Sequence, residues 1–294
     1  MHACVRARAA RSGRLAAPAL ACHPVRAMIR DLLHNPPDDP FLPTEGIHNL
    51  RDYGGYRCAD GARVKSGVLF RSGQHMEASD SDLETIQRLG IRTVIDLRGT
   101  SERTRFPCRR HAQFDAHVIA YDGETSNSPP HEGGGGAIDM TAETARERMM
   151  AVYNRMPVNP AMIDIFSRYF DALATREGAS LVHCFAGKDR TGIAASLLLH
   201  VLGAHRDDVV GEYLRTNDAP TREVLERQSL PRMEKHYASI DPGAMTNLMG
   251  VLPDYIETYF REVERISGSL DTYLSLTLGV DPKKKAQLRE RLLA

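Results

Sequence analysis

The segment that most constrains the fold lies between residues 179 and 202. A short apolar run, Ala179 to Val182, is followed by a polar loop with two glycines and then by the apolar stretch Ile193 to Leu202. This order predicts a buried strand, a tight loop and a helix. The loop begins at Cys184 and holds an arginine six residues later, at Arg190. We therefore expect an α/β protein with a mostly parallel central sheet, helices on both faces and a helical C-terminal part.

This loop has the composition of a phosphate-binding site. The first N–H groups of a helix lack intrahelical partners, and the helix dipole adds partial positive charge there. Gly187 allows the backbone to turn its N–H groups inward, and the guanidinium of Arg190 can bind two phosphate oxygens at once. We expect the phosphate to be held by Phe185, Ala186, Gly187, Lys188, Asp189 and Arg190.

Cys184 stands at the start of the same loop. A cysteine at a helix N-terminus beside a cation is readily ionised, and a thiolate that faces bound phosphate is placed for in-line attack. We therefore expect Cys184 to form a cysteinyl-phosphate that water later hydrolyses. Thr191 is expected to donate a hydrogen bond to the sulfur, and His183 to orient the loop. The competing interpretation is a buried structural cysteine, which leaves the glycine and the two cations of the loop unexplained.

The composition argues against several other classes of protein. The 294 residues include 38 lysines and arginines and 38 aspartates and glutamates, so the overall charge points neither to nucleic acid nor to an anionic membrane. The five cysteines form no Cys-x-x-Cys pair, and no zinc-ligand spacing occurs. Gly187-Lys188 is followed by Asp189, which disfavours a Walker nucleotide site. We expect neither a metal nor a cofactor, and no transmembrane span is visible.

Residues 1 to 40 differ from the rest of the chain. Arginine and alanine dominate there, and no acidic residue precedes Asp31. An organellar presequence has this composition, whereas the apolar run from Leu15 to Cys22 is short for a secretory signal and is interrupted by a proline. We favour a disordered tail, or a false start upstream of Met28, and expect one catalytic domain over residues 41–294. A cytoplasmic location is expected, with export left open.

The string from His183 to Gly192, His-Cys-Phe-Ala-Gly-Lys-Asp-Arg-Thr-Gly, resembles the signature of the cysteine-based protein tyrosine phosphatases. Its Ala-Gly-Lys-Asp-Arg form is similar to that of a bacterial branch with mycobacterial and listerial members. The resemblance runs from about Gly46 to the C-terminus, because segments 49–52, 69–72 and 213–218 are also similar to family motifs. It implies the cysteine-phosphatase fold of the dual-specificity type, and phosphotyrosine proteins or phosphoinositides as substrates.

The resemblance also directs attention to the aspartates. A departing phenolate is a poor leaving group, because the pKa of tyrosine is about 10, so an acid must protonate it. In the family this acid follows a strand, and Asp122 follows the strand expected at residues 116–121. Asp189 inside the loop is the competing acid, expected to shape the loop or to assist hydrolysis. The third alternative is that Asp122 is an ordinary loop residue.

Lys188 bears on the choice of substrate. A second cation in this phosphate-binding loop, here called the cradle, favours a substrate with several phosphates, such as a phosphoinositide head group. Alternatively, Lys188 pairs with Asp189 or with another acid at the rim. Other classes of protein also use such a loop. The alternatives are a phosphate-binding module without turnover, a sulfurtransferase and an arsenate reductase. The sequence indicates neither the oligomeric state nor the physiological substrate.

The remaining periodicity predicts the frame around the loop. Strands are expected at 68–72, 91–97 and 116–121, and helices at 79–89, 140–156, 160–175, 207–217, 220–238, 253–267 and from 281 onward. The long loop at 123–137 is expected to carry a mobile lid. We expect Arg51 and Asp52 to form a structural pair, and the turn from Arg98 to Glu102 to belong to the scaffold.

Overall fold

A five-stranded sheet forms the centre of the structure, a computed structural model that describes residues 39–125 and 139–294. Its strands are β1 (Arg51–Asp52), β2 (Leu69–Ser72), β3 (Ile91–Asp96), β4 (His117–Ala120) and β6 (Ala179–His183). They lie in the order β1-β2-β6-β3-β4, and only β1 is antiparallel to its neighbour. The prediction of an α/β fold with a mostly parallel sheet is confirmed. A separate two-stranded sheet joins β5 (Asp139–Met140) to β7 (Ser239–Ile240).

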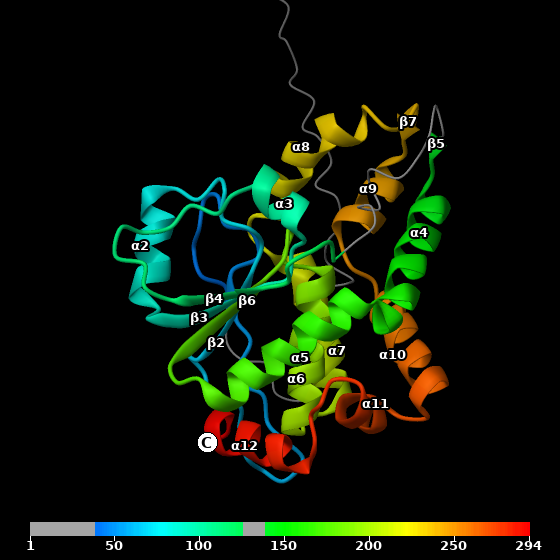
Figure 1. Cartoon of the computed structure of the whole chain (residues 1–294). Coiled ribbons are helices and arrows are strands. Elements are labelled where there is room, and N and C mark those ends of the chain that lie inside the picture. The colour runs from blue at the N-terminus through cyan, green and yellow to red at the C-terminus, as the bar shows by residue number, and fades with distance from the viewer. Residues whose placement is uncertain (1–38, 126–138) are drawn as a thin grey trace, which may run out of the picture.

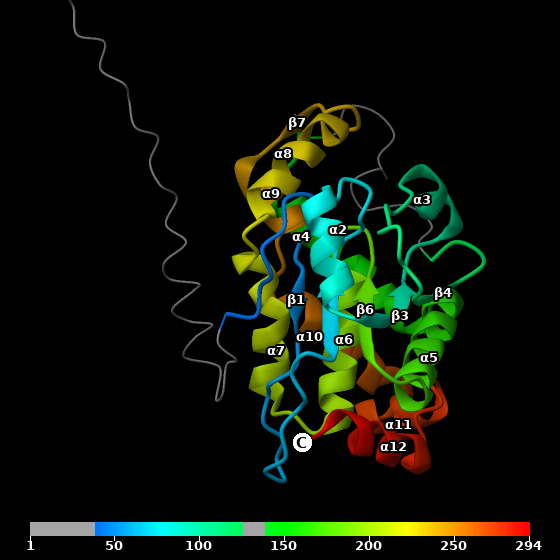
Figure 2. The ribbon, with the colours of Figure 1, turned by 90° about the vertical axis from the view of Figure 1, so that its left-hand side faces the viewer.

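Helices cover both faces of the central sheet (Figures 1 and 2). Helix α2 (Asp80–Arg88) lies on one face, and α5 (Pro160–Thr175) and α6 (Asp189–Leu202) lie on the other. The other helices are α3 (Thr100–Arg105), α4 (Ala142–Arg155), α7 (Arg206–Leu214), α8 (Arg222–Met233), α9 (Pro242–Met249), α10 (Pro253–Ser267), α11 (Leu270–Leu276) and α12 (Pro282–Leu292). Two short 3-10 turns follow α4 and α7, at Met156–Val158 and Arg215–Asp218.

Two apolar cores, one on each face of the sheet, explain why the central strands carry apolar residues on both sides. Phe70, Leu181 and Val94 are neighbours in register and pack in the core that contains α2. The next residues along β6 and β3, Val182 and Ile95, pack in the larger core on the opposite face. Successive strand residues point to opposite faces, so a parallel sheet covered on both sides reads as a continuous apolar run.

Most of the predicted helices are present with small changes at their ends. Helix α8 ends at Met233 instead of residue 238, and α4 begins after Thr141, whose side chain accepts from the N–H of Thr144. The short elements β1, α3, β5, β7, α9 and α11 were not predicted. No helix in the described ranges combines the length and apolar character needed to cross a membrane. Residues 1–38 and most of the predicted lid loop lie outside the described residues.

Strand β6 occupies the middle of the sheet and delivers the Cys184 loop to the start of α6. Helices α3 and α8 lie at the end of the sheet where β6 ends and this loop begins, in the upper part of Figure 1. The carboxyl ends of parallel strands meet at one edge, which is where α/β proteins bind ligands. The loop singled out in the sequence therefore lies at the expected end of the sheet.

Candidate active site

Cys184 lies directly after the central strand, in a loop that ends where α6 begins at Asp189. Its side chain is 2% exposed. Gly187 has a φ of 70°, and a Cβ at this position would lie 2.4 Å from the backbone carbon of Ser72. A left-handed residue with no room for a Cβ must be glycine. The glycine in the middle of the motif is therefore required by the close approach of the loop to β2.

Neighbouring side chains hold the loop by a carbonyl group and leave its amides available. The carbonyl of Gly187 accepts from Asn49 Nδ2 at 2.7 Å and from Arg71 Nη2 at 2.8 Å. The N–H groups of residues 186–190 donate to no protein acceptor within the part of the chain that the structure describes. Consecutive unpaired amides at a helix N-terminus are ready donors to an anion. This arrangement suits the phosphate site expected from the sequence.

A buried ion-pair network lies beneath the loop. Glu212 on α7 accepts from Arg51 Nε at 2.8 Å and from Arg71 Nη1 at 2.7 Å, and both arginines are fully buried. Burial by itself would raise the pKa of Glu212, but the two cations lower it, so the carboxylate stays charged. Arg51 and Asp52 do not pair with each other as predicted, because neighbouring strand residues point to opposite faces. Asp52 instead accepts from two backbone N–H groups.

Replacing Glu212 with alanine is expected to lower the free energy of unfolding by about 3–5 kcal/mol, because two buried guanidinium groups lose their counter-charge. Denaturant unfolding at pH 7 measures this loss. Since folding lowers the pKa of Glu212 from its ordinary value of 4.5, its contribution is present above that pH and fades as the pH falls toward the folded pKa. The difference between variant and wild type should therefore shrink in acid.

The ion pair between Glu226 and Arg222 on α8 provides a matched control, because both side chains are partly exposed. Glu226→Ala is expected to change the free energy of unfolding by no more than about 0.5 kcal/mol. Equal losses in the Glu212 and Glu226 variants would contradict a special role for the buried network.

The guanidinium of Arg190 is bound along one edge. Nη1 lies 2.5 Å and Nη2 lies 2.8 Å from the two carboxylate oxygens of Glu102 on α3, and Nη1 also donates to Thr125 Oγ1 at 3.0 Å. Nε donates to no acceptor among the described residues. Burial lowers the pKa of Arg190, but Glu102 outweighs burial and raises it, so the group stays charged. The Nε–Nη2 edge is left for two phosphate oxygens.

The sequence reasoning missed the roles of Glu102 and Thr125. The turn after β3 was expected to be scaffold, and Arg98 indeed pairs with Asp96 at 2.7 Å, whereas Glu102 orients Arg190. A signal was present, because β3 and β6 are parallel neighbours and the segments that follow them meet at one edge of the sheet. A charged residue just after β3 is therefore a natural partner for the arginine of the loop.

His183 and Thr191 flank the loop. His183 is fully buried, and burial lowers its pKa to about 4, although Asp96 Oδ2 at 3.7 Å opposes the shift. Its Nδ1 lies 3.3 Å from the carbonyl oxygen of Cys184, so it contacts the loop backbone, which suits the orienting role predicted for it. Thr191 Oγ1 is buried and has no hydrogen-bond partner among the described residues. The hydrogen bond predicted from Thr191 to the sulfur is therefore not present.

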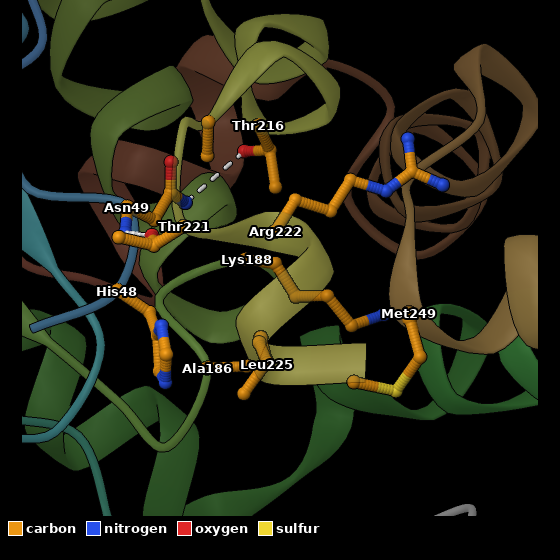
Figure 3. Close-up of a pocket in the computed structure, with 10 residues that line it drawn as sticks. His48, Asn49, Ala186, Lys188, Thr216, Thr221, Arg222, Leu225 and Met249 are labelled. Atoms are coloured by element: carbon orange, nitrogen blue, oxygen red, sulfur yellow. Dashed lines mark hydrogen bonds between the residues drawn. The ribbon is translucent and has the colours of Figure 1, made fainter. Parts of the chain in front are cut away.

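Lys188 lies beside the loop, where its charge is already engaged. Its Nζ is 3.1 Å from Asp189 Oδ1 and 3.2 Å from the carbonyl oxygen of Gly250. Figure 3 shows the side chain extending toward Met249, along a cavity of about 10 Å³, the space of one water molecule. Of the two predicted alternatives, the pairing with Asp189 is the one observed. In this conformation the ammonium group of Lys188 is engaged by Asp189 and by the carbonyl of Gly250.

The two candidate acids differ in their surroundings. The side chain of Asp122 is fully exposed and lies 4.0 Å from Arg103. It makes no hydrogen bond or ion pair to the Cys184 loop within the described ranges. The side chain of Asp189 is 23% exposed, belongs to the loop, and accepts from the hydroxyl of Tyr153 at 2.8 Å. The structure therefore brings Asp189 to the cradle and leaves Asp122 in solvent.

A cluster behind the loop has the residue types of a metal site but not the electrostatics. Asp96, Cys108 and His183 offer three ligand atoms within 4.8 Å of one another. Arg98 Nη2 donates to Asp96 Oδ2 at 2.7 Å and to Cys108 Sγ at 3.2 Å. The guanidinium thus occupies the position that a cation would need and repels any other positive charge there. These residues do not suit a metal.

Comparison with known proteins identifies relatives across most of the chain. A Cupriavidus necator protein named as a tyrosine-protein phosphatase is 35% identical over 267 residues, which cover 86% of this chain and 88% of that protein. The triple specificity protein phosphatase PtpB of Mycobacterium tuberculosis is 29% identical, over 78% of this chain and 91% of PtpB. The crystal structure of P. aeruginosa TpbA gives a TM-score of 0.30 at 16% identity, over 68% of this chain and 89% of TpbA.

A family model also matches most of the chain. The model described as the tyrosine phosphatase family covers residues 42–294, which include the Cys184 loop and every described helix and strand from β1 to α12. This chain therefore belongs to the tyrosine phosphatase family.

Proposed function

We propose that this tyrosine phosphatase hydrolyses phosphotyrosine in two steps, with Cys184 as the nucleophile and residues 41–294 as one catalytic unit. The sulfur attacks phosphorus, the P–O bond to the tyrosine oxygen breaks, and water then displaces the sulfur to release phosphate. The observation that carries the proposal is the anchoring of Arg190 by Glu102, which leaves the Nε–Nη2 edge unpaired. That edge and the amides of residues 186–190 would stabilise charge on the transferred group.

The same proposal assigns the general acid to Asp189. The acid gives its proton to the tyrosine oxygen as the P–O bond breaks, and the resulting carboxylate takes a proton from the attacking water. Asp189 supports this role because it lies in the loop and keeps part of its carboxylate exposed. Asp122, proposed from the order of elements, is the alternative, and its full exposure beside Arg103 weighs against it.

An asparagine at position 189 tests this assignment, because it keeps the size of Asp189 but has no acidic proton to transfer. We expect Asp189→Asn to lower kcat/KM for phenyl phosphate about 100-fold, and to lower it far less for nitrophenyl phosphate, whose leaving group is less basic. Assays in EDTA exclude a contribution from metal ions. Asp122→Asn is the control, expected to stay within about twofold of wild type on both substrates. The reverse result would move the acid to Asp122.

Phosphotyrosine is favoured over phosphoinositides as the substrate by the surroundings of Lys188. Its Nζ is bound by Asp189 and by the carbonyl of Gly250, and the adjacent cavity holds about one water molecule. To bind a second phosphate of a head group, Lys188 would have to leave both partners. The ratio of kcat/KM for a phosphotyrosine peptide to that for phosphoinositide vesicles measures this preference.

A further inference from the structure

A tyrosine from outside the loop contacts the proposed acid. Tyr153 lies on α4, and its hydroxyl donates to Asp189 Oδ1 at 2.8 Å. The side chain is completely buried, and its ring packs against that of Tyr255 with the centroids 5.6 Å apart. A buried hydroxyl is costly unless it is hydrogen-bonded. The position of this hydroxyl is therefore closely defined by the packing around it.

The direction of the hydrogen bonds at Tyr153 follows from its two partners. Its oxygen also lies 2.8 Å from the hydroxyl oxygen of Tyr213 on α7. A carboxylate only accepts, so the proton of Tyr153 points to Asp189 and Tyr213 must donate to Tyr153. Burial, reinforced by the nearby charge of Asp189, raises the pKa of both tyrosines well above its usual value. Both hydroxyls therefore stay protonated, and the chain from Tyr213 to Asp189 keeps one direction.

The two oxygens of Asp189 are left in different situations. Oδ1 accepts from Tyr153 and lies 3.1 Å from Lys188 Nζ. Oδ2 accepts no hydrogen bond from the described part of the chain. The hydrogen bond from Tyr153 and the nearby charge of Lys188 at one oxygen fix the rotation of the carboxyl group and favour placing its proton on the other oxygen. Oδ2 is then the oxygen available to exchange a proton with a substrate.

We propose that Tyr153 is a positioning residue, which holds Asp189 so that Oδ2 faces the leaving oxygen of the substrate. The inference rests on the proposed function, in which Asp189 is the acid. The Oδ2–H bond of Asp189 breaks and its proton moves to the tyrosine oxygen, while the P–O bond breaks and the S–P bond to Cys184 forms. Tyr153 keeps its own proton throughout. Helix α4 thereby contributes to the acid step although it lies outside the signature loop.

The leaving group of the substrate provides the test, because a positioning role for the acid depends on it and a purely structural role does not. Tyr153→Phe keeps the ring and removes only the hydroxyl. We expect kcat/KM for phenyl phosphate to fall about tenfold and that for nitrophenyl phosphate to change less than about twofold. In the double variant with Asp189→Asn, Tyr153→Phe should cause no further loss, because both changes remove the same step.

Tyr255→Phe is the matched control. Tyr255 is equally buried and contacts the same ring, but its hydroxyl donates to the carbonyl of Asn247 at 3.0 Å and not to Asp189. Tyr255→Phe should change kcat/KM by the same factor for phenyl phosphate and for nitrophenyl phosphate. An equal loss for Tyr153→Phe on both substrates, or no loss on either, would overturn the inference. If Asp189→Asn itself lacks leaving-group dependence, the proposed acid fails, which is a separate outcome from the failure of Tyr153 alone.

Discussion

Replacing Cys184 with serine is expected to abolish turnover, with kcat for phenyl phosphate at least about 10⁴-fold below that of wild type. A serine hydroxyl is far less acidic than a thiol, so it would need a general base to attack, and the imidazole next to it in the chain is not placed for that role. His183 is the nearest imidazole in sequence, but its Nδ1 faces the carbonyl oxygen of residue 184 and its Nε2 faces Asp96. Phosphate release in EDTA measures the loss.

Binding should survive the same substitution, because the loop amides and Arg190 are unchanged. We expect a phosphotyrosine peptide to bind Cys184→Ser with a Kd within about tenfold of the wild-type KM. Cys108→Ala is the control for loss of a thiol, since Cys108 lies outside the cradle, and it should retain turnover. Turnover above a tenth of wild type in Cys184→Ser, or no phosphate attached to Cys184 in acid-quenched wild type, would exclude the cysteinyl-phosphate mechanism.

Local sequence patterns predicted the frame of this protein well. Helices were expected at 160–175 and 253–267, and α5 and α10 have these bounds. Pro160 and Pro253 each stand in the first turn, where a missing N–H costs nothing, and an apolar stripe follows on each helix. The strand, loop and helix around Cys184 were predictable for the same reason, since hydrophobic period and turn chemistry are properties of a single segment.

Ion pairs between residues that lie far apart in the sequence were not predictable in this way. Arg190 and Glu102 are 88 positions apart, and Arg51 and Glu212 are 161 positions apart. Periodicity shows whether a segment is buried, but it does not show which charge it meets there. Helix α3, which carries Glu102, has no buried residue, so no apolar period marks it in the sequence. The charge that orients the phosphate-binding arginine was therefore assigned to the scaffold.

The family motifs outside the Cys184 loop contain polar and charged residues that are buried, and their burial indicates a structural role. Asn49 and Arg71 come from two separate motifs, and Glu212 directly precedes the third. All three belong to the network that holds the carbonyl of Gly187. Charged residues are rarely buried unless they are paired. A charged motif in an otherwise apolar strand, such as Leu69–Ser72, therefore indicates a buried support for another segment, which the sequence alone does not identify.

Arg190 differs from these paired residues, because its Nε–Nη2 edge has no partner among the described residues. We therefore expect a large loss of activity even from a substitution that keeps the charge. Arg190→Lys is expected to lower kcat/KM for phenyl phosphate about 10³-fold, although the charge is kept. Lysine is a point charge, and it cannot bind the two oxygens of Glu102 on one edge and two phosphate oxygens on the other. The loss should be similar for nitrophenyl phosphate, because phosphate binding in the transition state does not depend on the leaving group.

Two further variants distinguish the bidentate binding by the Arg190 guanidinium from the effect of charged residues near it. Glu102→Gln keeps one acceptor for Nη1 or Nη2 and should lower kcat/KM only about tenfold, since Arg190 stays in place with weaker orientation. Arg103→Lys changes an arginine on the same helix that donates to the carbonyls of Arg98 and Tyr121, and it should stay within about threefold of wild type. If Arg190→Lys lies within tenfold of wild type, the Nε–Nη2 edge does not hold the transferred phosphate, and the anchoring by Glu102 has another purpose.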